Sequence, residues 1–342
     1  DAYHVYAVDW SPGRIEWSLD GRVYHVCTPA SLPKGARWVF NDGLFFILLN
    51  LAVGGNWPGA PDSSTHFPQE FRIDYVRVYD RASTVSPGVV PRAYFGAYLE
   101  PRDRVLHGAG QDPDGFRDYS AALGAGRQPK IIMTYIGLGK SVAEITEWGR
   151  ALKLQLEAAG PADILPQIGV SMVNGNDNGT GIDAAVAEGK RDREIAALCD
   201  AVRSLGRPVF VRIGYEFEGD WNGYRPESYR KAFVRVTQAF RGRHLPVATV
   251  WCAAVMSAGD RGMTRLLAYY PGDEWVDWWS LDLFSADEMS AKLPTAFCEE
   301  AGRHHKPVMI GESTARYVGV HDGQKSWDKW FAPYFAFIRG RP

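Results

Sequence analysis

The feature that most constrains the fold is an alternation of strand-like and helix-like segments over residues 93–342. Short apolar runs, rich in Val, Ile and aromatic residues, are each followed by a stretch with helical spacing of its apolar residues. This order is typical of right-handed βαβ units, which build a parallel sheet covered by helices. The predicted strands cover residues 93–100, 130–138, 163–173, 208–216, 247–255, 276–284 and 307–314.

Seven such units in roughly 250 residues favour a (β/α)8 TIM barrel. A doubly wound nucleotide-binding sheet is a poorer match, because no GxGxxG motif follows any of the predicted strands. An eighth strand is not found before Pro342, and a barrel without it would have two open edges. We therefore expect that the chain is a fragment, that the eighth strand is borrowed from elsewhere, or that one element is misassigned. Helices are expected near residues 115–124, 141–160, 182–205, 226–244, 263–270, 290–305 and 323–338.

Residues 1–80 show a different pattern, in which several short segments alternate polar and apolar residues and are separated by turn sequences. This pattern predicts an all-β sandwich or a part of a jelly roll. Residues 81–92, RASTVSPGVVPR, contain little to bury and predict a linker to the second domain at 93–342. The predicted strands of the first part are residues 3–11, 14–21, 22–28, 44–53 and 71–80.

The bulk composition excludes some partners. The formal net charge of −2 gives no electrostatic case for nucleic acid or an anionic membrane as a partner. No apolar run reaches the ~18 residues that a membrane-spanning helix needs. Aromatic residues make up 13% of the chain, and such richness either fills cores or provides rings on which sugars stack. The four scattered cysteines lack metal-ligand spacing, so free thiols are expected and no cofactor is predicted.

Two glutamates stand where predicted strands end. Glu216 follows the fourth strand in PVFVRIGYEFEGDWNG, and Glu312 follows the seventh in KPVMIGESTARYVG. The carboxyl ends of barrel strands meet on one rim, where active sites of this fold lie. A pair of carboxyl groups about 5–5.5 Å apart is what a retaining glycoside hydrolase requires, one protonated and the other ionised. The pattern therefore predicts such a pair in one cleft, with nearby aromatic rings as sugar platforms.

A less specific interpretation competes with this one. Acidic residues after strands often cap helices or lie in solvated loops, and we assign Glu218, Asp220 and Glu100 to that class. If Glu216 and Glu312 belong there too, the chain is a non-catalytic carbohydrate-binding or scaffold protein with a vestigial site.

Three segments of the second domain resemble glycoside hydrolases of clan A, and family 26 in particular: RIGYEFEGDWNG, YYPGDEWVDWWSLDLF and PVMIGEST. Known members of that family include β-mannanases, some β-1,3-xylanases and lichenases. The resemblance implies that Glu216 is the acid/base and Glu312 the nucleophile. It further implies roles beside the substrate for Arg212, Trp221 and Trp251.

Two positions depart from the family pattern. Tyr215 stands where the family usually has a His before the acid/base, and Phe284 where it usually has a Tyr that hydrogen-bonds the nucleophile. We interpret these departures as a subgroup with shifted specificity, and count both residues, with Tyr98, as substrate-binding candidates. The expected substrate is a β-linked polysaccharide (β-glucan, mannan or xylan), and the expected location is extracellular.

The first 80 residues resemble the C-terminal part of a laminarinase-type family 16 glycoside hydrolase, through FFILLNLAVGGNWPG and FRIDYVRVYD. The Glu-x-Asp-x-x-Glu motif of that family does not occur in residues 1–90, so this part is expected to be inert. In relatives a surface Ca²⁺ can involve the Asp of DYVRVY, here Asp74, but a plain strand Asp without metal is favoured. Half a sandwich leaves an open sheet edge, which predicts a larger parent chain or an oligomer formed through this segment.

Overall fold

The computed structural model divides the chain into two compact units, Asp1–Ala82 and Ser83–Pro342, and each is described by itself. The predicted linker, residues 81–92, lies outside the described residues. The structure describes residues 3–11, 13–40, 47–56, 59–68, 70–77, 95–101, 105–124, 127–159, 163–173, 181–255 and 262–341.

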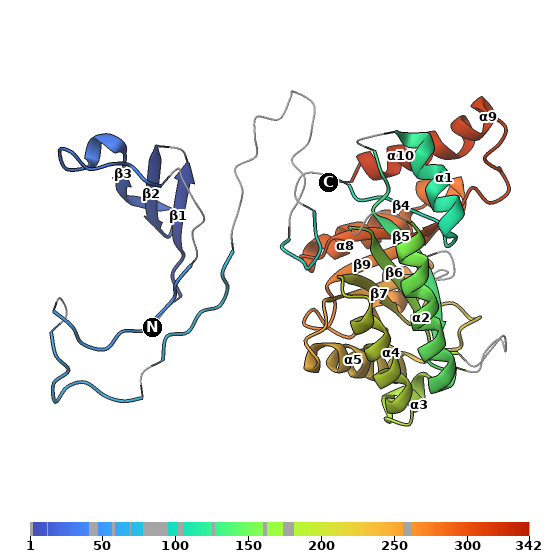
Figure 1. Ribbon diagram of the computed structural model, residues 1–342, viewed down its shortest axis with the longest axis horizontal. Coiled ribbons are helices and arrows are strands. Elements are labelled where there is room, and N and C mark those ends of the chain that lie inside the picture. The colour runs from blue at the N-terminus through green and yellow to red at the C-terminus, as the bar shows by residue number, and fades with distance from the viewer. Residues whose placement is uncertain are drawn as a thin grey trace. The chain divides into compact units, whose positions relative to one another are not determined.

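The first unit contains a three-stranded antiparallel sheet of β1 (Tyr6–Ser11), β2 (Arg14–Leu19) and β3 (Arg22–Cys27), in that order (Figure 1). The second hairpin turns on Asp20 and Gly21, whose φ angles of 48° and 76° are left-handed. An Asp-Gly pair suits a two-residue hairpin of this kind, because both central residues must adopt positive φ. A short 3₁₀ turn, η1 (Pro29–Ser31), follows β3.

Two further strands predicted for this unit, at 44–53 and 71–80, are not formed in their described parts, 47–53 and 71–77. A strand needs a neighbour to satisfy its backbone N–H and C=O groups. The side chains there are open to solvent, with Ile47 58%, Leu49 51% and Phe71 53% exposed. The described part of this unit is thus one antiparallel sheet, and the prediction of these two jelly-roll strands is wrong.

The second unit is built on a seven-stranded parallel sheet whose strands follow one another in chain order, from β4 at one edge to β10 at the other (Figure 1). The central strand β7 reads VFVRI and is buried along its whole length, as expected for a parallel strand covered on both faces. The strands are β4 (Gly108–Ala109), β5 (Ile131–Gly137), β6 (Leu165–Ser171), β7 (Val209–Ile213), β8 (Val247–Ala253), β9 (Trp278–Leu283) and β10 (Val308–Ser313).

The first strand of this sheet is β4, and the strand predicted at 93–100 is not formed in its described part, residues 95–100. Gly96 and Leu99 have φ angles of 78° and 65°, which no strand accommodates. The Glu100 carboxylate accepts the backbone N–H groups of Phe95 and Ala97 at 3.0–3.1 Å, so this segment is a loop tied to its own side chain. Alternating apolar residues alone do not reveal such a loop.

Helices connect the strands and form the outer layer of the sheet. Several begin at recognisable caps: Asp112 accepts the N–H of Gly115 at 2.6 Å ahead of α1, and Ser141 and Glu144 cap α2 reciprocally. A single helical stretch ends the chain, with a π-helical turn in its middle. The helices are α1 (Pro113–Leu123), α2 (Val142–Ala159), α3 (Asp183–Ala187), α4 (Asp192–Ser204), α5 (Pro226–Gly242), α6 (Gly262–Leu267), α7 (Ala286–Ser290), α8 (Lys292–Arg303), α9 (Gln324–Ser326), η3 (Trp327–Phe331) and α10 (Ala332–Arg339).

The sheet curls so strongly that distant strands meet across its inner face. Gln167 of β6 donates from Nε2 to the carbonyl oxygen of Gly311 in β10 at 2.8 Å, although three strands lie between β6 and β10. The result is a curled, open sheet of the TIM type, with β4 and β10 at its edges. Among the described residues no eighth strand joins these edges.

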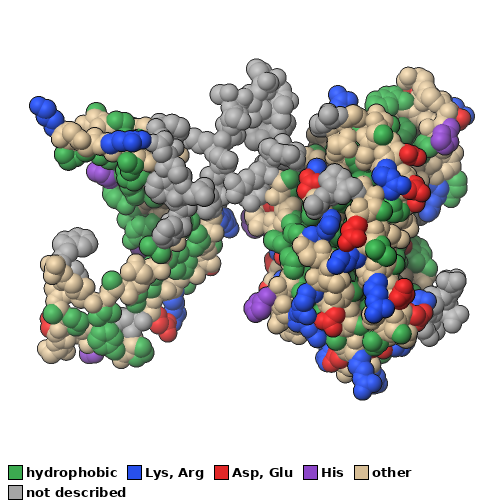
Figure 2. All heavy atoms as spheres, viewed as in Figure 1, with side chains coloured by type: hydrophobic (Ala, Val, Ile, Leu, Met, Phe, Trp, Pro, Cys, Tyr) green, Lys and Arg blue, Asp and Glu red, His purple; other side chains and the backbone are tan. Residues whose placement is uncertain are grey.

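The surfaces of the two units differ in composition. Hydrophobic side chains gather over the first unit, whereas Lys and Arg alternate with Asp and Glu over the visible helical face of the second (Figure 2). Within the described parts of the chain, no helix combines the length and the apolar character needed to cross a bilayer.

Candidate active site

Polar side chains occupy the inner face of the curled sheet toward its carboxyl end. Inward-facing positions alternate along each strand, so β7 points Phe210 and then Arg212 to the interior. On β9 the inward sequence is Trp278, Ser280 and Asp282. In both strands the inner face changes from apolar at the start to charged near the end, and this places the polar groups at the rim where barrel enzymes carry out chemistry.

Arg212 is the centre of this polar group. Its side chain is fully buried, and its Nη2 donates to Glu312 Oε1 at 2.6 Å. Its Nη1 lies 3.4 Å from both carboxylate oxygens of Asp282, which is fully buried as well. One guanidinium thus joins carboxylates from β9 and β10. Burial raises the pKa of Asp282 well above its usual range and the charge of Glu312 adds to this, whereas Arg212 acts in the opposite direction.

Glu312 reaches this position because β10 bulges. Ile310 pairs with Leu281 and Ser313 with Leu283, so two residues of β10 stand opposite Asp282 alone. A bulge of this kind turns the side chain that follows it toward the other face of the sheet. Gly311, the first of the two, also has to be small: a Cβ there would lie 2.5 Å from Ser280 Oγ and 2.7 Å from Asp282 Oδ1.

The loop after β7 holds Glu216 in a conformation that side-chain-bearing residues rarely adopt. Glu216 has a φ of 50°, in the left-handed region, which is a local strain that often accompanies function. Asn222 secures the loop, since its Nδ2 donates to the carbonyl oxygens of Tyr215 and Glu216 at 3.0 and 2.9 Å. Glu218 is buried and accepts the N–H of Val255 at 2.7 Å, so it fastens the loop to the end of β8.

Trp221 lies against Glu216 and donates its indole N–H to Oε2 at 2.8 Å. Gly219 leaves room for this ring, because a Cβ there would come within 2.4 Å of Trp221 Cε2. The ring is 40% exposed, so one part of it contacts the glutamate while another part is open to solvent. Such an arrangement can orient a carboxyl group and offer a stacking surface at the same time.

The two glutamates have different electrostatic surroundings. Burial raises the pKa of Glu216 to about 7, and the negative charge of Glu312 adds to the rise, while the Trp221 hydrogen bond lowers it. Glu312 instead contacts the buried guanidinium of Arg212, with 19% of its own side chain exposed. One carboxyl group is thus stabilised in the protonated form near neutral pH, and the other has a cation as its partner. The predicted separation of about 5–5.5 Å stays a prediction.

Tyr215 belongs to the same cluster. Its ring meets that of Tyr135, from β5, at 5.4 Å in an edge-on arrangement, and the Arg212 guanidinium lies 5.0 Å from its centroid. Burial is the main cause that raises the pKa of Tyr215 to about 12. The structure thus gathers five of the predicted site residues at one end of the sheet: Arg212, Tyr215, Glu216, Trp221 and Glu312.

Two other predicted residues, Trp251 and Tyr98, lie elsewhere. Trp251 is fully buried on the outer side of β8, with Phe217 stacked on it at 4.5 Å and Phe297 of α8 at 5.8 Å. Both faces of its ring are occupied by protein, so the predicted substrate-binding role of Trp251 does not agree with its place. The physical reason is the alternation of β8, which turns Cys252 to the interior and Trp251 to the helices.

Tyr98 lies at the opposite end of the sheet. Its carbonyl oxygen accepts the indole N–H of Trp278, the first residue of β9, at 2.7 Å. The neighbouring Leu99 packs there against an apolar cluster, so the predicted substrate role of Tyr98 does not agree with its place.

Phe284 follows directly after β9, at the end of the sheet that carries the site. The Arg316 guanidinium lies over its ring, 4.6 Å from the centroid. The substrate role of Phe284 stays a prediction.

Sequence reasoning missed Tyr135 and Asp282. Asp282 had a recognisable signal, since it is the one charged residue inside the apolar run WWSLDL, just as Arg212 is in VFVRI. A charge in a parallel strand is costly unless it is paired, so two such residues of opposite sign point to each other. Tyr135 had no comparable signal, because an aromatic residue in a strand is ordinary.

The described residues include no group of three or more His, Cys, Asp or Glu side chains that could hold a metal ion. Asp74 lies in segment 71–77 of the first unit, which has no regular secondary structure. The four cysteines are free thiols; Cys199 and Cys252 are buried, whereas Cys27 and Cys298 are partly exposed.

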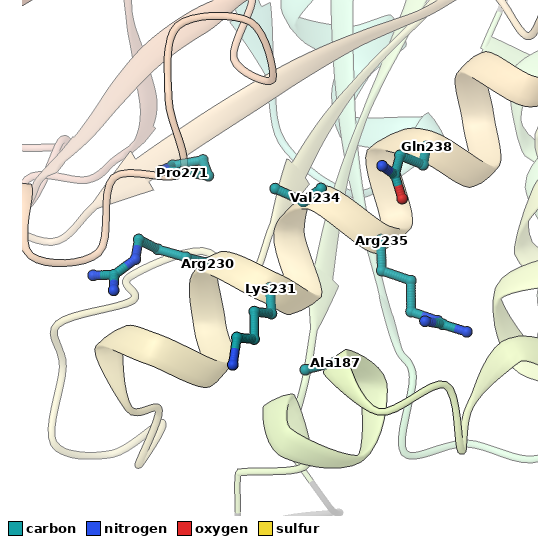
Figure 3. Close-up of a pocket in the computed structure, with 7 residues that line it drawn as sticks. All are labelled: Ala187, Arg230, Lys231, Val234, Arg235, Gln238 and Pro271. Atoms are coloured by element: carbon teal, nitrogen blue, oxygen red, sulfur yellow. The ribbon is translucent and has the colours of Figure 1, made fainter.

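A hollow on the outer helical layer does not compete with this site. Figure 3 shows it along α5, and its cationic side chains are all engaged. Arg235 pairs with Asp192 at 2.6 Å, Lys231 with Glu227 at 2.7 Å, and Arg230 donates to a backbone carbonyl. The lining residues are Ala187, Arg230, Lys231, Val234, Arg235, Gln238 and Pro271.

Residues 1–77 match the family described as Glycosyl hydrolases family 16. None of the residues gathered at the candidate site belongs to that segment.

The chain is 30% identical over 263 residues to Beta-1,3-xylanase from Alcaligenes sp, a match that covers 70% of this chain and 54% of that protein. It is 29% identical over 263 residues to Beta-1,3-xylanase TXYA from Vibrio sp, covering 70% of this chain and 55% of that protein. The chain thus spans about half the length of the curated relatives it matches. A match over 70% of the chain cannot be contained in the first unit, which ends at Ala82, so it extends into the second.

Among solved structures, GH26C from Muricauda sp. MAR_2010_75 superposes with a TM-score of 0.50 and 12% sequence identity, covering 67% of this chain and 74% of that one. This likeness concerns the fold alone. The chain therefore resembles glycoside hydrolases in both of its units: family 16 in the first, and in the second a GH26 fold together with sequence similarity to β-1,3-xylanases.

Proposed function

We propose that this protein is a retaining endo-β-glycanase that cleaves a β-linked polysaccharide, with Glu216 as acid/base and Glu312 as nucleophile. The observation that carries the proposal is the contrast between the two carboxyl groups. The pKa of Glu216 is raised to about 7, whereas Glu312 contacts a buried guanidinium at 2.6 Å. A carboxyl group with a raised pKa beside a second one that is paired with a cation is the arrangement that acid and nucleophile require.

The reaction then proceeds in two displacements. In the first, a Glu312 oxygen attacks the anomeric carbon, the glycosidic C–O bond breaks, and the Glu216 proton passes to the leaving oxygen. In the second, water attacks the anomeric carbon of the glycosyl ester and gives a proton to Glu216, while the bond to Glu312 breaks. The first step leaves Glu216 ionised beside a neutral ester, so the charge that raised its pKa has gone when it must act as a base.

For the substrate, we propose β-1,3-xylan first, because the two similar proteins with the widest coverage are named for that activity. β-Mannan and β-glucan are the alternatives within the same class of chemistry. Trp221, with 40% of its surface exposed beside Glu216, is the ring best placed to stack on a sugar. We further propose that the curled sheet is the greater part of a (β/α)8 barrel, that the reaction uses no cofactor, and that the protein acts outside the cell.

The test measures reducing-sugar release from β-1,3-xylan, β-1,4-mannan and β-1,3-glucan by the wild type and by Glu216→Gln and Glu312→Gln. We expect each variant to lose on the order of 10³-fold or more in kcat while binding polysaccharide in affinity electrophoresis. Proton NMR of the first product should show retained anomeric configuration.

Asp220→Asn is the matched control, since Asp220 lies on the same loop, is 95% exposed and makes only a surface pair with Arg265. It should keep wild-type activity. A wild type that retards on the gel but releases no sugar from any of the three polymers would favour the carbohydrate-binding alternative, and an inverted product would exclude the nucleophile role of Glu312.

A further inference from the structure

We propose that Tyr135 is a positioning residue for the nucleophile: its hydroxyl and the Arg212 guanidinium together hold the Glu312 carboxylate in the orientation that attack requires. This inference rests on the proposed function of Glu312. It assigns a role to a side chain on β5. Strand β6 separates β5 from β7, which carries Arg212, and the other carboxylate partner of Arg212, Asp282, lies on β9.

The contacts around the Arg212 Nη2 nitrogen place the three groups together. Nη2 is 2.6 Å from Glu312 Oε1 and 3.3 Å from the Tyr135 hydroxyl oxygen. An arginine N–H can only donate, so the hydroxyl oxygen acts as acceptor toward Arg212 and its own proton remains available. The phenol and the carboxylate therefore share one cationic donor and lie side by side.

The hydroxyl proton has two acceptors within reach. Met133 Sδ lies 3.1 Å from the oxygen, and a hydrogen bond with Glu312 contributes to the raised pKa of Tyr135, after the larger effect of burial. A thioether sulfur is a weak acceptor, whereas a carboxylate is a strong one. In the proposed arrangement the proton turns from Met133 Sδ to Glu312, and a chain runs from Arg212 through the phenol to the carboxylate.

The ring of Tyr135 is held in place by its neighbours. A Cβ on Gly169 of β6 would lie 2.6 and 2.8 Å from two atoms of this ring and 3.1 Å from the Tyr215 ring. Glycine at this position therefore leaves the space that both rings use. Tyr215 packs edge-on against Tyr135, with 5.4 Å between the ring centroids. A side chain confined in this way can fix a hydrogen bond instead of sampling several.

A second donor matters because a carboxylate held by one hydrogen bond can still rotate about its terminal C–C bond. Two donors from different strands restrict that rotation, and attack at the anomeric carbon depends on orientation. The side chain of Phe284, which follows β9, has no hydrogen-bond donor, so it cannot supply the second hydrogen bond to Glu312.

The experiment compares wild type with Tyr135→Phe, which removes the hydroxyl and keeps the ring. Each is incubated with 2-deoxy-2-fluoro-β-xylobiosyl fluoride and, separately, with the mannobiosyl and laminaribiosyl reagents. In this reaction a Glu312 oxygen bonds to the anomeric carbon and fluoride leaves, so the trapped ester is seen by mass spectrometry. We expect trapping and kcat to slow by on the order of 10- to 100-fold, with KM and the reagent's binding constant changed less than about threefold.

A second variant tests the same contact without removing the phenol. In Gly169→Ala the new methyl group should displace the Tyr135 ring and with it the hydroxyl, so trapping should slow as well. Combined with Tyr135→Phe, it should add little further loss, because both changes remove one interaction. Tyr269→Phe is the control, since it deletes another buried hydroxyl, whose hydrogen bond at 3.1 Å goes to the carbonyl of Tyr224 outside this network. It should trap at the wild-type rate.

The outcomes separate this inference from the proposed function. If the wild type is labelled at Glu312 and Tyr135→Phe is labelled equally fast, the role of Tyr135 is refuted while the nucleophile stands. If the wild type is labelled at another residue or by none of the reagents, the proposed function itself fails. Additive losses in the double variant would likewise contradict the inference, because Gly169→Ala would then act through a different contact.

Discussion

The two ends of the curled sheet use the same strands for opposite purposes. At the amino end the inward side chains form a dry cluster of Phe210, Ala248, Val250 and Trp278, closed by the loop that contains Leu99. At the carboxyl end the same strands contribute Arg212 and Asp282, with Glu312 added by the bulge in β10. The first arrangement gains free energy from burial, and the second has to offset the desolvation of charges by pairing them.

This difference teaches where the fold and the chemistry reside. Phe210 and Trp278, whose rings meet edge-on at 5.5 Å, can be buried against any apolar neighbours of suitable volume. Burying Arg212 is tolerable only because two carboxylates surround it, and each of those is held by its own strand. Changes at the amino end should therefore affect stability alone. Changes at the carboxyl end should affect activity, and some of them should lower stability as well.

The largest effect is expected for Arg212→Met. It leaves Asp282 buried without its cation and removes the guanidinium from Glu312, so the free energy of unfolding should fall by roughly 3–5 kcal/mol. The rate should fall by on the order of 10³-fold or more, because the nucleophile loses its main donor. Urea denaturation and sugar-release assays measure the two losses.

The double variant Arg212→Met with Asp282→Leu sharpens this result. Replacing both members of a buried pair with apolar residues is often neutral, so much of the stability should return. Activity should not return, because Glu312 still lacks Arg212. A double variant that recovers activity as well would mean that the pair serves the fold and has no part in the reaction.

A loss of stability without a loss of activity is expected for Phe210→Ala at the amino end. The cavity left in the apolar cluster should lower the free energy of unfolding by about 3–5 kcal/mol. At a temperature where the variant is folded, kcat/KM should stay within about twofold of the wild type. Phe210→Leu should cost less than ~1.5 kcal/mol as a volume-conserving control. A loss of activity in the fully folded Ala variant would show that the two ends are coupled.

The two ends also differ in how far the sequence could predict them. Periodicity located six of the seven parallel strands, because each is a short apolar run between helical segments. It failed at residues 93–100, where the same alternation belongs to a loop tied by Glu100 and turned by left-handed residues. No local sequence pattern distinguishes a side chain that accepts hydrogen bonds from nearby backbone N–H groups from one that points to solvent.

At the carboxyl end, the position of Glu216 and Glu312 after apolar strands was enough to place both on one rim. Trp251 was misplaced because its face depends on the register of β8, which a motif does not specify. Tyr135 was missed because its partner, Glu312, is 177 positions away in the chain and reaches it only through the curl of the sheet and the bulge in β10.

The smallest expected effect concerns the hydrogen bond from Trp221, which lowers the raised pKa of Glu216. Trp221→Phe keeps an aromatic side chain, although a smaller one, and removes the N–H that donates to Glu216 Oε2 at 2.8 Å. A hydrogen bond to the ionised carboxylate favours the ionised form, so its loss should raise the pKa further above about 7. The basic limb of kcat should move to higher pH by about 0.5–1 unit, because Glu216 keeps its proton longer.

Stability should follow the same direction. The folded-state pKa of Glu216 lies above its unfolded value, so the stability linked to its proton is full below the unfolded value and is lost as pH rises through about 7. In Trp221→Phe that loss should extend to higher pH, and in Glu312→Gln it should end at lower pH, because a neighbouring negative charge has gone. Carbon-13 NMR titration of the glutamate carboxyls and melting curves between pH 5 and 9 test both shifts. Shifts in the same direction in the two variants would mean that Trp221 and Glu312 do not act oppositely on Glu216, and the contrast between its neighbours would have to be abandoned.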